Sequence, residues 1–210
     1  MSRFTIRLAE PADLPAAYHV CLKTGDHGRD GEPFYADDPD ALGRIFVGPY
    51  LALEPELSLV LVDELGVCGY CLAALDSQTF YQRYDHEWRP QLCRDFPFPP
   101  GDPLTWTRAQ TVHSWYHQPD YFCPQPYADY PSHIHIDLLE RARGQGQGKK
   151  MMHQQMQALT ERRSPGAHLN VSAQNLPAQA FYNQLGFQEL CRKGPPTTGS
   201  IYLAQRFPVP

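Results

Sequence analysis

The pattern of apolar and polar positions along the chain predicts its strands. Residues 4–8 and 132–139 alternate between polar and apolar side chains, which is typical of strands with two different faces. Two apolar runs, 57–63 and 66–75, are separated only by Glu64-Leu65, which indicates a hairpin. Shorter apolar runs predict further strands at 169–172, 187–191 and 201–207.

Apolar side chains at helical spacing lie between these strands. The predicted helices cover 11–23, 38–47, 77–96, 106–117, 151–162 and 177–185. The chain has 21 prolines, and their clustering between Pro90 and Pro131 indicates irregular structure there. Because no linker or repeat interrupts the pattern, we expect a single domain over 1–210, with an inserted helical and proline-rich segment at about 77–131.

Charge and hydropathy argue against two classes of function. Lys and Arg number 18 and Asp and Glu number 23, a net charge of −5, which disfavours nucleic-acid binding because phosphates require a basic face. No apolar run approaches the roughly 20 residues of a membrane span, so no membrane contact is expected. Residues 1–7 lack the apolar stretch of a signal peptide, which predicts a cytoplasmic protein. The oligomeric state stays open.

Two motifs resemble metal or redox sites but have unsuitable contexts. Cys68 and Cys71 form a C-x-x-C pair inside a predicted strand, where side chains three apart point to opposite faces. His113 and His117 share one face of a predicted helix, but Ser114 stands where a zinc protease has glutamate. We therefore predict no metal site.

A glycine-rich loop follows the strand at 132–139 and opens a helix. Glycines let successive backbone N–H groups converge on an anion, and the start of a helix adds partial positive charge, so this loop predicts a phosphate site. No hydroxyl residue follows Lys149 or Lys150, which excludes the Walker pattern, and the dinucleotide fingerprint is not matched. The loop reads Arg143-Gly144-Gln145-Gly146-Gln147-Gly148-Lys149.

A second block, about 30 residues further on, makes the loop more specific. It has the order N-x-x-A-x-x-F-Y-x-x-x-G-F, beginning at Asn175 and including Phe181 and Tyr182. Together the two blocks resemble the GNAT acyl-CoA N-acyltransferases. The resemblance implies an α/β GNAT fold: a mixed, twisted sheet of about seven strands with helices on both faces. The sheet would be splayed at the CoA site, between the strand of Asp137 and the strand of Val171.

The same resemblance implies acetyl-CoA as co-substrate and assigns residues to it. Backbone N–H groups from Gly144 to Lys149 would hold the pyrophosphate, and the backbone at Leu138 and Leu139 would pair with the pantetheine arm. Asn175 would bond that arm, and Tyr182 would face the thioester sulfur. The positions assigned to acetyl-CoA are Leu138, Leu139, Arg143, Gly144, Gln145, Gly146, Gln147, Gly148, Lys149, Asn175, Phe181 and Tyr182.

A closer resemblance covers nearly the whole chain. The segments that carry it are 5–7, 21–23, 66–70, 130–137 and 181–186. They look like the C-terminal acetyltransferase-like domain of animal O-GlcNAcase, which free-standing bacterial proteins share and whose CoA loop is degraded in animals. Here Arg143, Gly146 and Gly148 are intact, so binding of acetyl-CoA is expected. Hydrolysis of O-GlcNAc is not expected of these residues.

Acetyl transfer to an amine needs a base, a polarised carbonyl and an acid for the departing thiolate. Tyr182 is the predicted acid, and Asp137 is predicted to be the base or the amine anchor. His133 and His135 share a strand face with Asp137, and either would relay a proton; His135 is the predicted catalytic member. A catalytically silent module that binds a peptide or partner in the same groove is the alternative.

The acceptor stays open between a small amine, an amino sugar and a peptide lysine. The loop at 25–31, with Asp26, Asp30 and the adjoining Glu32, is acidic and would suit an amine. Aromatic side chains of the inserted segment are expected to wall the acceptor pocket: Trp106, Trp115, Tyr116, Tyr121 and Tyr127.

Overall fold

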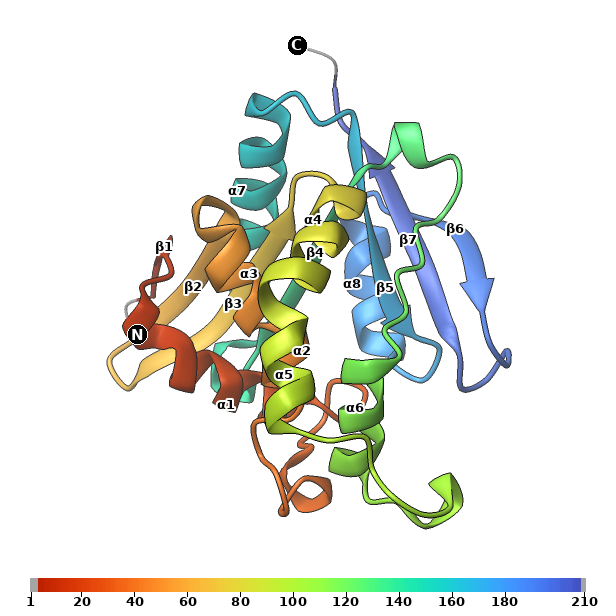
Figure 1. The fold of residues 1–210 in the computed structure, drawn as a ribbon. Coiled ribbons are helices and arrows are strands. Elements are labelled where there is room, and N and C mark those ends of the chain that lie inside the picture. The colour runs from red at the N-terminus through yellow and green to blue at the C-terminus, as the bar shows by residue number, and fades with distance from the viewer. Residues whose placement is uncertain (1–3, 209–210) are drawn as a thin grey trace.

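Seven strands form one sheet in the computed structural model, which describes residues 4–208, and helices cover both faces of that sheet (Figure 1). The strands follow the order β1-β2-β3-β4-β5-β7-β6 across the sheet. Their bounds are β1 (Thr5–Leu8), β2 (Ser58–Asp63), β3 (Gly66–Ala74), β4 (Ser132–Leu138), β5 (Gly166–Ser172), β6 (Gln188–Lys193) and β7 (Ser200–Arg206). The predicted α/β fold with a mixed sheet is confirmed.

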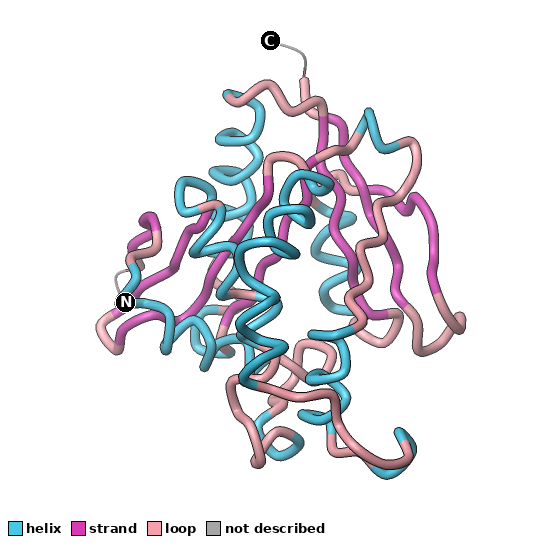
Figure 2. The backbone as a smooth tube through the Cα atoms, viewed as in Figure 1, coloured by secondary structure: helices cyan, strands magenta, loops and turns pink. Residues whose placement is uncertain are grey.

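The neighbouring strands β4 and β5 are parallel, whereas the other neighbouring pairs are antiparallel. Pairing between β4 and β5 is confined to Ser132 with Ala167 and His133 with His168. Beyond those pairs the strands diverge, and Figure 2 shows two groups of magenta strands that fan apart from one end. The splay predicted between the strands of Asp137 and Val171 is therefore confirmed.

Eight α-helices are present among residues 4–208. They are α1 (Leu14–Thr24), α2 (Gly43–Phe46), α3 (Gly48–Leu53), α4 (Ser77–Arg83), α5 (Arg89–Asp95), α6 (Arg108–His117), α7 (Gln147–Glu161) and α8 (Leu176–Gln184). A π-helical turn at Tyr84–Trp88 joins α4 to α5. No helix in this described part of the chain is long and apolar enough to cross a membrane.

Two predicted helices have different bounds in the structure. The helix expected at 38–47 is reduced to α2, and α3 begins at Gly48 with Pro49 in its first turn, where proline is favoured because no intrahelical bond needs its N–H. The helix expected at 151–162 begins earlier, at Gln147. Gly146 is left-handed and ends the preceding loop, so the next residues already turn as a helix.

Adjacent residues of β3 show which helices lie on which face. Tyr70 contacts His135, and His135 packs against Phe46 of α2. Cys71 points to the opposite face, where its sulfur lies 3.9 Å from that of Met152 on α7. Figure 1 shows α4, α5 and α6 in front of the sheet and α7 behind it. The segment from Leu75 to Pro131, which contains α4, α5 and α6, therefore covers the same face of the sheet as His135.

The core is continuous through the sheet and both helical layers. Tyr70, Leu72, Met152 and Leu159 are fully buried. Burying such side chains stabilises the fold by about 1.5–3 kcal/mol each. This packing fixes the position of β4 between the two helical layers. β4 is the strand that carries the polar residues of the site.

Candidate active site

The loop between β4 and α7 forms a cradle of backbone N–H groups. Gly144 and Gly146 have φ angles of +70° and +73°, which glycine adopts without steric cost. The six successive N–H groups from Gly144 to Lys149 donate to no acceptor in the described part of the chain. The next N–H, of Lys150, bonds the carbonyl of Gly146 at 3.2 Å. Free donors at a helix start are suited to an anion such as a pyrophosphate.

Side chains of the loop hold its shape. Arg143 donates from Nε to the carbonyl of Leu138 at 2.7 Å, which ties the loop to the end of β4. Gln145 donates to the carbonyl of Arg141 at 2.8 Å, and Gln147 reaches the carbonyl of Gln145 at 3.4 Å. These predicted residues therefore lie together, with their side chains bracing the loop while its N–H groups stay free.

The end of β4 offers one free backbone N–H to a ligand in the splay, that of Leu138, whose carbonyl already accepts from Arg143 Nε at 2.7 Å. Leu138 points its N–H and carbonyl away from β3, because the next residue forms the bond to that strand. The N–H of Leu139 donates to the carbonyl of Cys68 at 2.8 Å, and its carbonyl accepts from Ala142 at 2.9 Å. The N–H of Leu139 is therefore already used in the bond to β3, so the prediction that Leu139 pairs with the pantetheine arm through this group is wrong.

Three polar side chains meet on the face of β4 that looks toward α2. The Tyr70 hydroxyl donates to Asp137 Oδ2 at 2.6 Å and lies 2.9 Å from His135 Nε2. His135 Nε2 and Asp137 Oδ2 are 3.4 Å apart. The predicted shared face of His135 and Asp137 is confirmed. The sequence did not identify Tyr70 as a partner, since only the β3–β4 register brings it opposite Asp137.

Burial and neighbouring charges shift the pKa values of Asp137 and His135. Burial raises the pKa of Asp137, while His135, the Tyr70 hydroxyl and Arg143 act in the opposite direction and are outweighed. Burial also lowers the pKa of His135, although the Asp137 carboxylate raises it in part. A carboxyl whose pKa is raised, beside an imidazole whose pKa is lowered, is suited to taking up a proton and passing it on.

Tyr182 of α8 lines the same cleft as Asp137. Tyr182 is 8% exposed, and its hydroxyl forms no hydrogen bond to any residue that the structure describes. Burial raises the pKa of Tyr182, and the nearby Asp137 raises it further, so the phenol keeps its proton. A protonated and unengaged phenol is what a general acid requires.

A cleft of about 720 Å³ contains these groups. It follows the splay between β4 and β5, and Asp137, His135, Tyr182 and Asn175 all line it. Asn175 accepts the N–H of Ala178 at 3.2 Å and so caps α8, while its Nδ2 is turned toward Gly28. A bond from the Asn175 amide nitrogen to the cofactor arm stays a prediction.

Phe181 is turned toward the cradle. A Cβ placed on Gly148 would lie 3.3 Å from Phe181 Cζ, so glycine at this position lets α7 and α8 approach closely. The predicted cofactor contact of Phe181 thus lies at the helix start that carries the cradle.

Comparison with known proteins gives this arrangement a family. Residues 127–187, which include the cradle and α8, match the acetyltransferase (GNAT) family. The crystal structure of SsHAT has 35% sequence identity to this chain and superposes on it with a TM-score of 0.87. The match covers 97% of this chain and 98% of the SsHAT chain. This chain belongs to the GNAT acetyltransferase family.

Curated relatives and more distant structures agree. Protein O-GlcNAcase from Rattus norvegicus and from Mus musculus are each 30% identical over 190 residues, which is 90% of this chain. This GNAT chain spans about a fifth of the length of those relatives, 20% in each case. A GNAT phosphinothricin acetyltransferase from Sinorhizobium meliloti, solved with acetyl-CoA, shares the fold with a TM-score of 0.57 at 15% identity. The predicted resemblance to GNAT proteins and to O-GlcNAcase is confirmed.

The acidic loop of this GNAT chain does not supply free carboxylates. Asp26 pairs with Arg108 at 2.8 Å and with Arg29 at 2.9 Å. Lys23 binds both Asp30 and Glu32. The prediction that the acidic loop at 25–31 suits an amine is therefore wrong as far as free negative charge is concerned, because Lys23, Arg29 and Arg108 pair with these carboxylates.

Aromatic residues of the inserted segment divide into two groups. Trp115 and Tyr121 line the cleft as predicted. The prediction is wrong for the other three. Tyr116 is fully buried and donates to the carbonyl of Ala41, Trp106 donates to the carbonyl of Pro100, and the Tyr127 hydroxyl donates to Asp76. Sequence reasoning also missed cleft residues, because helical phase alone did not select them: Phe46, Tyr50, Phe80, Tyr81 and Tyr84.

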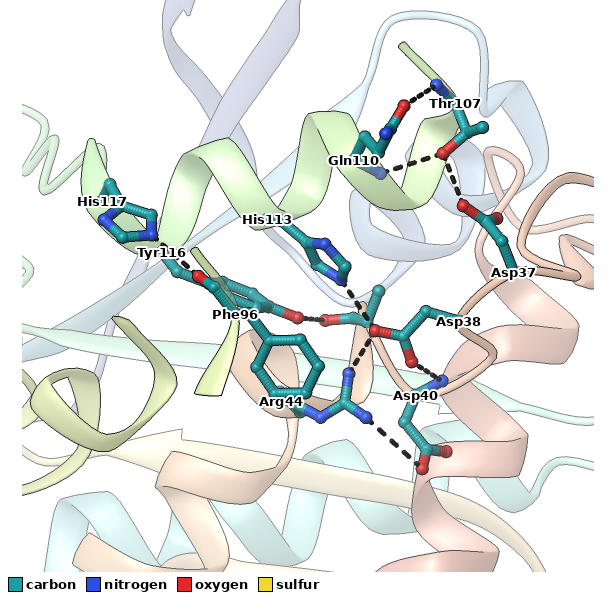
Figure 3. A network of polar contacts seen from close by, with 11 residues as sticks. Asp37, Asp38, Asp40, Arg44, Phe96, Thr107, Gln110, His113, Tyr116 and His117 are labelled. Atoms are coloured by element: carbon teal, nitrogen blue, oxygen red, sulfur yellow. Dashed lines mark hydrogen bonds and ion pairs between the residues drawn. The ribbon is translucent and has the colours of Figure 1, made fainter. Parts of the chain in front are cut away.

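The histidines of α6 have structural partners (Figure 3). His113 Nε2 lies 2.7 Å from Asp38, and His117 Nε2 lies 2.9 Å from the carbonyl of Phe96. Within residues 4–208 no three ligating side chains gather as a metal site. Cys68 and Cys71 are both buried, with the sulfur of Cys68 directed at the carbonyl of Leu61.

Proposed function

We propose that this chain transfers the acetyl group of acetyl-CoA to a primary amine. The observation that carries the proposal is the run of six free N–H groups from Gly144 to Lys149, placed where the β4–β5 splay leads to Asp137 and Tyr182. A cradle for a pyrophosphate and a cleft with an acid and a base at its inner end are the parts that acyl transfer from a CoA thioester requires.

The cofactor fits the cradle and the splay together. The N–H groups of the loop would hold the pyrophosphate, and the outward-facing N–H of Leu138 would bond the pantetheine arm as it runs alongside β4. The free amide nitrogen of Asn175 would bond the same arm from the β5 side. The Sinorhizobium meliloti relative of the same fold, solved with acetyl-CoA, supports this placement.

The reaction assigns one task to each side chain. The amine nitrogen attacks the thioester carbon, so a C–N bond forms and the C–S bond breaks. The amine gives its proton to Asp137, with His135 as a relay, and Tyr182 protonates the departing thiolate. Negative charge on the carbonyl oxygen would be stabilised by backbone N–H groups at the open edge of β4.

Two measurements test the proposal. Calorimetric titration with acetyl-CoA should show saturable binding, and a panel of free amines with a thiol reagent should show amine-dependent release of CoA. Failure to bind acetyl-CoA would refute the cradle assignment. Binding without turnover of any amine would instead favour the silent module that binds a partner in this groove.

A further inference from the structure

Resting on the proposed amine acetylation, we infer that the acceptor is a small monoamine that carries an aromatic ring. The acceptor part of the cleft is walled by stacked rings, and it offers a single carboxylate without a cationic partner. The first feature suits a planar apolar body, and the second suits one ammonium group.

A three-ring stack forms one side of the cleft. Tyr81 of α4 stacks on Tyr121 with centroids 4.9 Å apart and planes at 22°, and on His133 of β4 at 5.5 Å and 13°. Phe80 and Tyr50 meet the His133 ring edge-on at 5.2 and 5.5 Å. A ring that enters this side of the cleft meets further rings, and such pairs are worth about 0.5–1.5 kcal/mol each beyond area burial.

The aromatic surface continues inward to the proposed reaction centre. Phe46 and His135 both line the cleft, with ring centroids 5.9 Å apart. The fully buried Tyr70 packs against the His135 ring at 5.2 Å and bonds Asp137, which lines the cleft beside it. At the outer end Trp115 lines the cleft and is 41% exposed. The rings therefore extend from the solvent to the carboxylate that would hold the amine.

Hydrogen-bonding atoms along the wall are largely engaged within the protein. His133 Nε2 lies 2.8 Å from the Tyr50 hydroxyl, and its Nδ1 lies 2.7 Å from Ser77 Oγ. His168 Nδ1 bonds the carbonyl of Tyr130 at 2.8 Å. Both ring nitrogens of His133 are thus engaged, so within the stack His133 presents ring surface rather than free donors or acceptors, which disfavours a ligand rich in hydroxyl groups, such as an amino sugar, against this wall.

The charges around the cleft allow one cation. The residues that line it include no lysine or arginine, and its two aspartates are Asp120 and Asp137. Asp120 pairs with Lys193 at 2.5 Å, whereas Asp137 contacts His135 and Tyr70. Asp85, behind Tyr121, pairs with Arg89. A lysine in a basic peptide would bring several cations to a cleft with one free carboxylate, so a monoamine fits better.

The test compares three acceptors on the wild-type chain: 2-phenylethylamine, glucosamine and a lysine-rich peptide. Release of CoA should give a kcat/KM for 2-phenylethylamine at least about tenfold above the other two, because apolar pockets discriminate by roughly 10- to 200-fold. The ratio of kcat/KM for 2-phenylethylamine over n-propylamine then measures the contribution of the ring itself.

Substitutions in the aromatic wall of the cleft should change the ratio of kcat/KM for 2-phenylethylamine over n-propylamine. Tyr121→Ala should lower it by about tenfold, whereas Tyr121→Phe keeps the ring and should retain it. Trp115→Ala, at a partly exposed site, provides a second variant if Tyr121→Ala does not fold. The Kd for acetyl-CoA should stay the same in all of them, which separates the acceptor wall from the cofactor cradle.

The outcomes distinguish the inference from the proposed function. Equal or better turnover of n-propylamine, glucosamine or the peptide would overturn the aromatic acceptor while leaving amine acetylation in place. An unchanged ratio in both alanine variants would also overturn it. Binding of acetyl-CoA with no turnover of any amine would refute the proposed function, and the inference with it.

Discussion

The Tyr70 hydroxyl donates to Asp137 Oδ2 at 2.6 Å and lies 2.9 Å from His135 Nε2. A hydroxyl has one proton, so when Tyr70 gives it to the carboxylate, His135 must donate from Nε2 to complete the second bond. The lone pair of the neutral imidazole is then on Nδ1. Tyr70 is thus a positioning residue that fixes the carboxylate and the tautomer of His135 from a buried place on β3.

Tyr70→Phe should move the acidic limb of the pH–rate profile to higher pH. The Tyr70 hydrogen bond holds the pKa of Asp137 below what burial alone would set, so removing it raises that pKa. The ionised carboxylate then forms only at higher pH. Acetyl-CoA affinity should not change, and a profile identical to that of the wild type would exclude this role.

Asp137→Asn should slow turnover by about 10²-fold or more but stabilise the fold at pH 7. Burial raises the folded pKa of Asp137 above its ordinary 3.8, so folding favours the protonated form. Its contribution to stability is therefore present below the ordinary pKa and is lost as pH rises through the folded pKa. Urea unfolding should show the variant to be more stable at pH 7, with the difference shrinking toward pH 3.

Tyr182→Phe should lower turnover by about 10²-fold, the lower end of the range for a general acid, because a thiolate is a fair leaving group. The ring and its packing stay, so the free energy of unfolding should change little. The Kd for acetyl-CoA should stay close to that of the wild type, since the lost interaction belongs to the transition state. Wild-type turnover in this variant would remove the acid role.

Gly146→Glu should abolish acetyl-CoA binding, because a negative side chain would stand against the pyrophosphate in the cradle. No atom lies within 4 Å of a Cβ at this position, so the fold should survive the cost of about 1–2 kcal/mol for a side chain at its φ of +73°. Gly101→Glu is the matched control: its φ is +82°, its surroundings are also open, and it lies in the loop before α6. Calorimetry should show binding in the control alone, and equal binding by both would place the cofactor elsewhere.

Asp38→Asn should destabilise the fold by about 1–3 kcal/mol at pH 7, between the cost of breaking an exposed ion pair and that of breaking a fully buried one, because this pair is partly buried. Asp38 binds Arg44 at 2.6 Å and His113 at 2.7 Å, and so fixes α6 against α2 (Figure 3). Burial acts to raise the pKa of Asp38, but Arg44 and His113 together hold it low.

A carboxyl with a lowered folded pKa contributes stability above its ordinary pKa and loses it as pH falls. The difference between wild type and Asp38→Asn in urea unfolding should therefore vanish in acid. A difference that stays constant from pH 7 down to pH 3 would contradict the ion-pair account. Asp40→Asn, at the more exposed partner of Arg44, should cost far less.

Features of this protein that depend on a few neighbouring residues could be predicted from the amino-acid sequence. Alternation along 132–139 placed His135 and Asp137 on one face, because side chains of a strand alternate whatever lies around them. The order of Arg143, Gly146 and Gly148 after that strand indicated the cradle, since glycines set the turn within a few residues. The mixed splayed sheet and the GNAT family followed from these motifs and are confirmed.

Features that depend on partners far along the chain could not be predicted, because they arise from contacts that form only when the chain folds. Asp26 is neutralised by Arg108, 82 residues away, so a loop that is acidic in sequence is paired in the fold. Leu139 loses its N–H to Cys68 because β3 lies beside it, and Tyr70 reaches Asp137 through the same register. The division of the aromatic residues between core and cleft was decided in the same way, by packing between elements that no local pattern encodes.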